Sequence, residues 1–326
     1  MRRVKIFSGT SHPSLTEAIC ERLGTTPGKC DLKKFSNGET SVDIGCSIRD
    51  QDVFIVQSGS AKANDSIMEL LILISACKGG SANKITAVMP YFPYSKQSKK
   101  KSHRGAITAR MLANLLTVAG VDHVITVDLH ASQMQGFFTK PVDNLYAEPL
   151  LARWIRHTVP NWRDSVVVSK NPGGTKRVTQ LADVLKLNFA LITTDRRQED
   201  ADRIPGNEKM ITLVGEVRRK TVLIVDDMID RAGSWISAAE HVKLRGGAKK
   251  VICIATHGVF GGNCLKEMED CSCIDQIVVT NSFPIPEDKR KGVKKLVTID
   301  LSQLLSEAIR RNHHGMFIAR WRNWKH

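Results

Sequence analysis

The stretch Thr221–Trp235 constrains the fold of this chain more than any other. Its first five residues, Thr221 to Val225, are apolar or β-branched, as in a buried strand of a parallel sheet. The carboxylates Asp226 and Asp227 follow, and a short loop, Asp230–Ser234, then leads into apolar residues at helical spacing. We therefore predict a strand, a loop and a helix of an open α/β sheet, in which ligands bind at the carboxyl ends of the strands.

The residues around this loop suit a sugar phosphate. A helix N-terminus offers free N–H groups to a phosphate, Gly233 lets the backbone approach closely, and Ser234 adds a hydroxyl donor. Asp226 and Asp227 can each accept hydrogen bonds from the hydroxyls of a ribose diol. An ordinary strand-turn-helix with solvated acids is the alternative. The order of parts resembles the ribose-5-phosphate signature of the phosphoribosyltransferase-like fold, with Arg231 in place of a Thr.

Length and composition bound the class of protein. The 326 residues suggest about two domains, and 42% hydrophobic with 25% charged residues indicates a soluble globular protein. No apolar run is long enough to span a membrane, and the N-terminus has no signal-peptide pattern. The eight scattered cysteines lack a zinc spacing, so we expect reduced thiols and a cytoplasmic protein.

The formal net charge of +15 fits a nucleic-acid binder or a protein that binds highly phosphorylated metabolites. The basic residues are spread along the chain and form no single stripe. We therefore expect no specific nucleic-acid ligand.

Strand and helix patterns alternate through both halves of the chain, which predicts parallel sheets with helices on their faces. Strands are expected at 4–7, 53–57, 85–89, 124–127, 165–168, 190–192, 222–225, 251–254 and 277–279. Helices are expected at 15–23, 67–77, 106–119, 174–186, 235–245 and 301–311.

Three of the strands match between the two halves. Phe54-Ile-Val-Gln matches Leu223-Ile-Val-Asp 169 residues later, Lys84-Ile-Thr-Ala-Val matches Lys250-Val-Ile-Cys-Ile 166 later, and Asp122-His-Val-Ile matches Asp275-Gln-Ile-Val 153 later. We infer a weak internal duplication and predict two similar α/β domains, 1–147 and 148–311, followed by a tail over 312–326.

Four further stretches carry chemistry. Lys34–Glu39 combines an aromatic ring, an amide and a carboxylate, as purine recognition requires, although a surface turn with a half-buried Phe fits equally well. The basic loop 90–104 can cover a triphosphate or be a solvated charge run. Asp128-Leu-His130 ends a strand, where His130 is either structural or a ligand for a metal–nucleotide complex. Ser169–Arg177 is a Gly-rich turn that opens a helix and suits phosphate, without the P-loop spacing.

Nine motifs occur together in one order and carry a specific resemblance. They are Phe35-Ser-Asn-Gly-Glu39, Phe92-Pro-Tyr94, Asp128-Leu-His-Ala-Ser-Gln133, Gln135-Gly-Phe-Phe138, Pro141-Val-Asp-Asn-Leu-Tyr146, Gly173-Gly-Thr-Lys-Arg177, Val225-Asp-Asp227, Thr256-His-Gly258 and Glu307-Ala-Ile-Arg-Arg311. From about residue 3 to 314 the chain resembles the ribose-phosphate pyrophosphokinase (phosphoribosyl diphosphate synthetase) family.

The resemblance implies two phosphoribosyltransferase-like domains, each with a central parallel sheet flanked by helices. It also implies that O1 of ribose 5-phosphate attacks the β-phosphorus of Mg-ATP, giving phosphoribosyl diphosphate and AMP, in a homo- or hetero-oligomer of homologous subunits. The N-terminal domain would be the ATP side and the C-terminal domain the ribose 5-phosphate side.

The resemblance also assigns roles to single residues. Those expected to bind ATP are Phe35, Asn37, Glu39, Lys96, Gln97 and His130. Those in the region assigned to Mg²⁺ are Asp128, His130 and Asp143. Those expected to hold ribose 5-phosphate are Asp226, Asp227, Asp230, Gly233 and Ser234, and Arg196 is the expected catalytic residue of the flap.

Several active-site positions depart from the family pattern. Thr194 stands in the place of a flap Lys, Lys96 in the place of an Arg, and Lys170-Asn171-Pro172 in the place of Pro-Asp-Ala. Because phosphoryl transfer relies on charge stabilisation, we expect impaired activity of the chain alone and function within a hetero-oligomer. The alternatives are a non-catalytic regulatory subunit of the synthetase complex and, less well supported, a base phosphoribosyltransferase.

Overall fold

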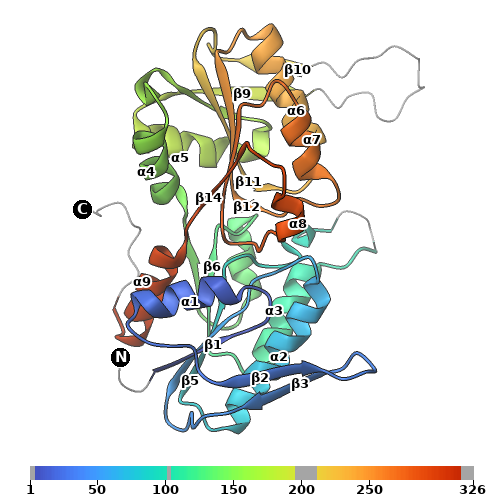
Figure 1. Ribbon diagram of the computed structural model, residues 1–326, viewed down its shortest axis with the longest axis vertical. Helices are drawn as coiled ribbons and strands as arrows, with labels where there is room; N and C mark the ends of the chain where they lie inside the picture. Colours follow the sequence, from blue (N-terminus) through green and yellow to red (C-terminus); the bar gives the residue numbers. More distant parts are fainter. Residues whose placement is uncertain (1–3, 101–103, 195–210, 317–326) are drawn as a thin grey trace. The chain divides into compact units, whose positions relative to one another are not determined.

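The computed structural model describes residues 4–100, 104–194 and 211–316, which form two compact units (Figure 1). The first unit comprises the chain up to Ala147, the short segment Asn281–Pro284 and the segment that begins at Asp300. The second unit comprises Glu148–Thr280 and Ile285–Ile299. Within these described ranges, no helix combines the length and the apolar character needed to cross a membrane.

The first unit is built on a five-stranded parallel sheet with the order β1-β4-β5-β6-β7. Its strands are β1 (Val4–Ser8), β4 (Asp52–Val56), β5 (Lys84–Met89), β6 (His123–Val127) and β7 (Val142–Leu145). An antiparallel hairpin, β2 (Cys30–Lys34) and β3 (Thr40–Ile44), stands outside this sheet. The helices are α1 (Pro13–Arg22), α2 (Ala63–Gly79), α3 (Thr108–Ala119) and α9 (Ser302–His313), with 3-10 turns η1 (Ser95–Gln97) and η2 (Ser132–Phe137).

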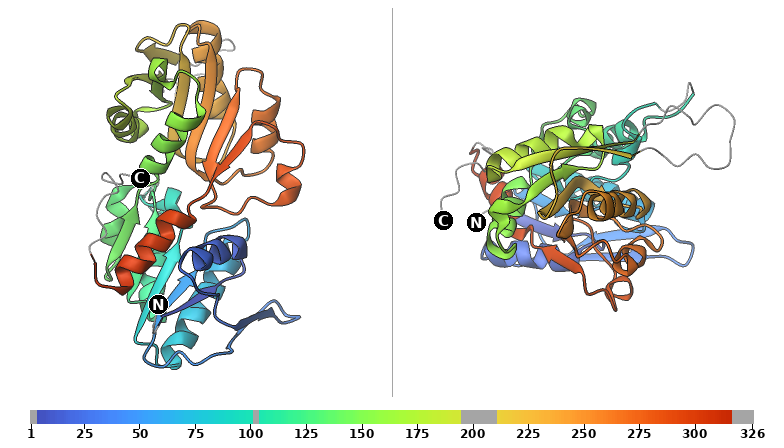
Figure 2. Two further views of the ribbon diagram at one scale, coloured as in Figure 1. Left: turned by 60° about the vertical axis from the view of Figure 1, so that its left-hand side comes forward. Right: turned by 90° about the horizontal axis from the view of Figure 1, so that it is seen from above.

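Apolar side chains cover both faces of this sheet. The face that carries Val53 and Ile55 packs against α2 and α3 in one buried cluster, which includes Leu70 and Leu116. On the other face α1 and α9 pack against each other (Figures 1 and 2). The near-continuous apolar strands therefore reflect burial on both sides, as in other parallel sheets.

The second unit has a seven-stranded sheet with the order β10-β9-β8-β11-β12-β13-β14, parallel except for the edge pair β9–β10. Its strands are β8 (Val166–Ser169), β9 (Asn188–Thr194), β10 (Ile211–Val214), β11 (Thr221–Ile229), β12 (Lys250–Gly258), β13 (Gln276–Thr280) and β14 (Leu296–Ile299). The helices are α4 (Glu148–Thr158), α5 (Thr175–Leu185), α6 (Gly233–Glu240), α7 (Cys264–Asp270) and α8 (Glu287–Arg290). Shorter turns are η3 (Trp162–Asp164), η4 (Pro172–Gly174) and the π-helical η5 (His241–Arg245).

The predicted α/β fold with central parallel sheets and flanking helices is confirmed. Each expected strand and helix is present, with ends that shift by a few residues. The elements that the sequence pattern did not indicate are β2, β3, β7, β10, β14, α4, α7 and α8. Most of these are short or polar, so their periodicity is weak.

The internal duplication is visible in the strand registers. Asp52 pairs with Lys84 in the first sheet, and Thr221 pairs with Lys250 in the second, which reproduces the sequence offsets of 169 and 166 residues. One loop detail also repeats. A carboxylate oxygen of Asp122 accepts the N–H of Ile85 at 3.0 Å, and that of Asp275 accepts the N–H of Val251 at 2.7 Å.

The second half of the sequence does not lie wholly in the second unit. The contacts group Asn281–Pro284 and α9 with the first unit, whereas the sequence interpretation counted them in a domain 148–311. Three interactions within the first unit explain this. His12 Nε2 donates to Asn281 O at 2.8 Å, Ser58 Oγ donates to Ser282 O at 2.5 Å, and the rings of Tyr91 and Phe283 pack edge to face.

Candidate functional site

The carboxylates Asp226 and Asp227 lie where the order of the strands in the second sheet reverses. Strand β8 ends at Ser169, which pairs with Val225, while β11 continues beside β12 as far as Ile229. The chain leaves β8 towards β9 on one side of the sheet and leaves β11 towards β12 on the other. Such a switch point opens a crevice at the carboxyl ends of two neighbouring strands, which is the usual ligand position in open α/β sheets.

The two carboxylates are buried, with 8% and 3% of their residue surface exposed for Asp226 and Asp227. Lys170 Nζ lies 2.7 Å from Asp226 Oδ2. Arg177 Nη1 lies 3.3 Å from Asp226 Oδ1 and 3.8 Å from Asp227 Oδ1. Two cations thus face two carboxylates, which offsets the desolvation of these charges.

Neighbouring groups fix this arrangement. Asn171 Nδ2 donates to Asp226 Oδ2 at 3.4 Å, and its Oδ1 accepts the N–H of Gly174 at 2.9 Å. The Lys170 ammonium also lies 5.2 Å from the centre of the buried Trp235 ring, a cation–π contact. At Gly174 a Cβ atom would lie 2.9 Å from Ser169 Oγ, so a larger residue would have to displace this hydroxyl, which donates to Asn171 O at 2.7 Å.

The loop Asp230–Ser234 leads into a helix, as predicted. Gly233 and Ser234 are the first residues of α6, and no side chain caps this end of the helix. Their N–H groups have no partner within the helix because the first turn lacks acceptors. Both residues are exposed, and the space over Gly233 is open within 4 Å of its Cβ position. Arg231 is exposed beside them, so the loop can receive an anion.

The turn predicted to recognise a purine is the tip of the β2–β3 hairpin. The Phe35 N–H donates to Glu39 O at 2.9 Å, and the Glu39 N–H donates to Asn37 Oδ1 at 3.1 Å. Gly38 has φ +89°, a value that favours glycine. Phe35 is 57% exposed, not half-buried, so its ring face is available for stacking.

The predicted ATP residues of the basic loop lie on η1. Lys96 and Gln97 are exposed, and Gln97 Oε1 accepts a hydrogen bond from Thr108 Oγ1 at 2.6 Å. Pro93 before them is buried and Tyr94 has φ +59°, so the start of the loop is held in one conformation. The predicted catalytic residue Arg196 lies outside the described residues.

The predicted magnesium set is not brought together. Asp143 pairs in register with Ile125, three residues before Asp128, which is about 10 Å along the strand. Its Oδ2 lies 2.6 Å from His123 Nε2, so Asp143 contacts the start of β6 and not its end. The structure therefore does not bring Asp143 together with Asp128 and His130, and the role of Asp143 at the metal stays a prediction.

Asp128 has a structural contact of its own. Its Oδ2 accepts the N–H of Ala147 at 3.0 Å, and its backbone is left-handed, with φ +42°. His130 is exposed two residues later. Across the described part of the chain, no group of three or more His, Cys, Asp or Glu side chains is arranged to hold a metal ion.

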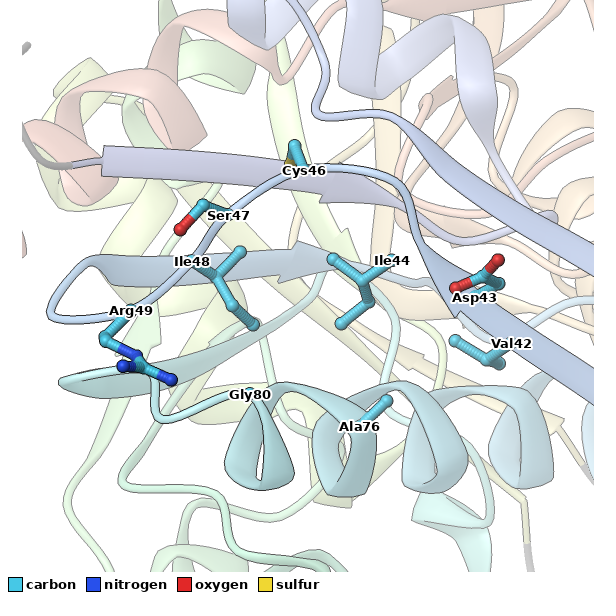
Figure 3. Close-up of a pocket in the computed structure, with 9 residues that line it drawn as sticks. All are labelled: Val42, Asp43, Ile44, Cys46, Ser47, Ile48, Arg49, Ala76 and Gly80. Atoms are coloured by element: carbon cyan, nitrogen blue, oxygen red, sulfur yellow. The ribbon is translucent and has the colours of Figure 1, made fainter.

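A hollow elsewhere in the first unit contains none of the predicted site residues. Figure 3 shows it between the loop after β3 and α2, with Ile44 and Ile48 facing the helix and Arg49 at one end. It encloses about 400 Å³ and is open to solvent. Its lining combines apolar side chains with a few polar groups and lacks paired carboxylates, so it does not compete with the switch point as a catalytic site.

Sequence reasoning did not place Lys170 and Arg177 in the site, although both lie in the Gly-rich stretch that it singled out. The available signal was topological. Residues that follow two adjacent parallel strands meet at one edge of the sheet. A prediction that β8 pairs with β11 would have brought Lys170 and Arg177 close to Asp226.

Comparison with known proteins agrees with this architecture. Residues 4–120 match the model for the N-terminal domain of ribose phosphate pyrophosphokinase, and residues 201–320 match that for the phosphoribosyl synthetase-associated domain. Ribose-phosphate pyrophosphokinase 1 of Saccharomyces cerevisiae is 50% identical, and that of Schizosaccharomyces pombe 49%, each over 98% of both chains.

A solved structure is also similar. The crystal structure of phosphoribosylpyrophosphate synthetase from Mycobacterium smegmatis superposes with a TM-score of 0.88 at 36% identity, covering 96% of this chain and all of that chain. From the identity to the yeast enzymes over nearly the full length, the chain belongs to the ribose-phosphate pyrophosphokinase family.

Proposed function

We propose that this chain is a ribose-phosphate diphosphokinase subunit, which forms phosphoribosyl diphosphate and AMP from ribose 5-phosphate and ATP for nucleotide biosynthesis. The observation that carries the proposal is the buried Asp226–Asp227 pair beside an uncapped helix N-terminus at the switch point of the second sheet. This combination presents acceptors to a ribose diol and N–H donors to a 5-phosphate.

The residues then take complementary roles. Asp226 and Asp227 orient the ribose ring, while Gly233 and Ser234 hold the 5-phosphate and Asp230 completes the loop. O1 of the sugar attacks the β-phosphorus of ATP, the bond from this phosphorus to the oxygen shared with the α-phosphate breaks, and O1 loses its proton. Holding the two substrates in line supplies much of the rate of such a transfer.

On the ATP side, the exposed ring of Phe35 stacks on the purine, and Asn37 and Glu39 bond its edge. Lys96, Gln97 and His130 contact the phosphates. Mg²⁺ enters with ATP as part of the substrate, on the side of Asp128 and His130.

We propose that the chain acts in an oligomer with homologous subunits and is a poor enzyme alone. Support comes from the replaced positions Thr194, Lys96 and Asn171, each of which changes charge or hydrogen bonding near the transferring group. Loss of one electrostatic contact of this kind lowers the rate by about 10²–10³. The same replacements are also compatible with the alternative, a purely regulatory subunit.

A synthetase assay on the purified chain, alone and mixed with its closest intact paralogue, tests both proposals. We expect low activity alone, a gain on mixing, and at least about tenfold more activity in the variant Thr194→Lys/Asn171→Asp/Lys96→Arg. A restored variant that stays inactive on its own, together with a mixture more active than the paralogue alone, would support the regulatory alternative. Full activity of the unmodified chain would contradict the impaired-subunit proposal.

We propose that nucleic acid is not a specific ligand, because the excess of basic residues is dispersed. Residual DNA or RNA binding should then weaken steeply with salt, which titration at several ionic strengths measures. We also propose a cytoplasmic location, which is compatible with eight free cysteines in the structure. Tight, sequence-selective binding at physiological salt would contradict the first proposal.

A further inference from the structure

Both oxygens of the Asp226 carboxylate are already contacted by groups of the chain itself. Lys170 and Asn171 donate to Oδ2 at 2.7 and 3.4 Å, and Arg177 and the Asp227 N–H donate to Oδ1 at 3.3 and 2.9 Å. The Lys170 side chain is only 12% exposed, which makes it part of the interior of the site.

This set of contacts does not suit a divalent cation. Mg²⁺ binds oxygen ligands in a near-ideal octahedron at about 2.0–2.1 Å and keeps several of its waters. The Lys170 ammonium, which can only donate hydrogen bonds, lies against Asp226 Oδ2, an oxygen that such an ion would need as a ligand. The Asn171 amide nitrogen is a second donor to the same oxygen. Lys170 also rests against the Trp235 ring, a position in which the ring stabilises its charge.

We infer that the ammonium of Lys170 takes the place of a divalent cation at Asp226, so that the second unit binds ribose 5-phosphate without Mg²⁺. The inference rests on the proposed function, since it takes the ribose 5-phosphate site as given and concerns what neutralises it. Lys170 and Arg177 balance the charges of Asp226 and Asp227. A sugar phosphate that approaches this pair therefore meets no net negative charge.

The ribose can still bind in this arrangement. Each carboxylate oxygen has more than one lone pair, so Asp226 can accept a sugar hydroxyl in addition to its internal donors. The phosphate lies away from the carboxylates, at the N-terminus of α6 beside the exposed Arg231. Metal dependence is then confined to ATP.

Isothermal titration with ribose 5-phosphate tests this, using the full chain in EDTA and in excess MgCl₂, without ATP. We expect the Kd of the unmodified chain to agree within about threefold between the two buffers. Lys170→Met, which keeps the length of the side chain and removes its charge, should weaken binding about tenfold in EDTA and regain part of it in MgCl₂. Lys170→Arg and the control Lys266→Met, at an exposed lysine of α7, should behave like the unmodified chain.

Three outcomes would overturn the inference while leaving the proposed function intact. One is binding by the unmodified chain only when Mg²⁺ is present. The second is equal affinity of the Lys170→Met and unmodified chains in EDTA. Equal loss in the Met and Arg variants, with unchanged circular dichroism, would also overturn it because packing and not charge would then be responsible. Absence of binding in both buffers would refute the ribose 5-phosphate site itself, and the inference with it.

Discussion

Asn171→Asp is the change that most directly tests how the switch-point site is neutralised. The Asn171 amide nitrogen donates to Asp226 Oδ2 at 3.4 Å, and aspartate would place a carboxylate oxygen there. The cap on Gly174 would survive, since its N–H is accepted by Oδ1, which both residues possess. The substitution therefore adds one negative charge and removes one donor, with little change in shape.

The size of the effect follows from the distance. Two unit charges 3.4 Å apart repel by about 5 kcal/mol at an effective dielectric constant of about 20. Lys170, at 2.7 Å from Asp226, can be shared between the two carboxylates and offsets roughly half of this. We expect the variant to lose about 2–3 kcal/mol of unfolding free energy in EDTA, or roughly 5–10 °C in the melting temperature of the second unit.

Calorimetric melting at pH 8 measures this loss. Mg²⁺ should stabilise the variant, by about 1.4 kcal/mol at ten times its Kd, and should leave the unmodified chain nearly unchanged. Asn263→Asp, at an exposed asparagine of the same unit, is the matched control. A variant as stable as the unmodified chain in EDTA, or equal Mg²⁺ stabilisation of both, would refute the reasoning.

Three further predictions concern the first unit. The pKa of Glu307 is lowered to about 2, chiefly by hydrogen bonds from Arg310, so Glu307→Gln should destabilise by about 1–2 kcal/mol at pH 7. In urea titrations that difference should disappear as the pH falls from about 4.5 to 2. Glu69→Ala should lower the melting point and cost about 3 kcal/mol, because Thr10 and a buried amide lose their acceptor. Burial lowers the pKa of His12, so its neutral form is favoured on folding, and His12→Gln should reduce the loss of stability as the pH falls below about 6.5.

Matched changes at exposed residues control for these variants. Glu17→Ala on α1 should leave the melting point unchanged, and His157→Gln on α4 should not alter the pH dependence. If the Glu307→Gln difference persists at pH 2, its ion pairs do not stabilise α9. If Glu69→Ala melts like the control, the buried hydrogen bonds around Thr10 contribute nothing measurable.

The sequence predicted the parallel cores because both sheets are buried on both sides. Apolar runs such as Val222–Val225 are hard to place anywhere else, and the observed strand registers agree with the offsets from which the duplication was inferred. The hairpin β2–β3 was missed because its strands are polar and half exposed. The return of α9 to the first unit depends on contacts such as that of Arg22 with Ser302, whose partners lie far apart in sequence.

The positions of the carboxylates in the proposed ribose site could be predicted, but not their environment. The apolar run before them predicted that Asp226 and Asp227 follow the end of a strand. In the structure β11 continues through both residues to Ile229, paired with β12, and both carboxylates are buried. The position of Asp143 beside His123 could not be predicted, because sequence order does not tell how β7 is registered against β6.

The matching registers also show how the described strand ends of the two units differ at this position. Ser8 pairs with Val56 in the first sheet, and Ser169 pairs with Val225 in the second, so Gln57 occupies the place of Asp226. The two strand ends have the same backbone pairing. Their difference lies in the side chains.

In the first unit both the oxygen and the nitrogen of the neutral Gln57 amide form hydrogen bonds within the protein. Its Oε1 accepts the N–H and hydroxyl of Ser11 at 3.1 and 2.6 Å, and its Nε2 donates to the buried Glu69 at 2.7 Å. At Gly9 a Cβ atom would lie 2.2 Å from Gln57 Oε1, so a side chain at this position would have to displace the Gln57 amide from its hydrogen bonds. In the second unit Lys170 stands at the place of Gly9 and reaches the carboxylate with a charge. Different residues at matching strand ends thus give a closed hydrogen-bonded junction in the first unit and a pair of buried carboxylates with cationic partners in the second.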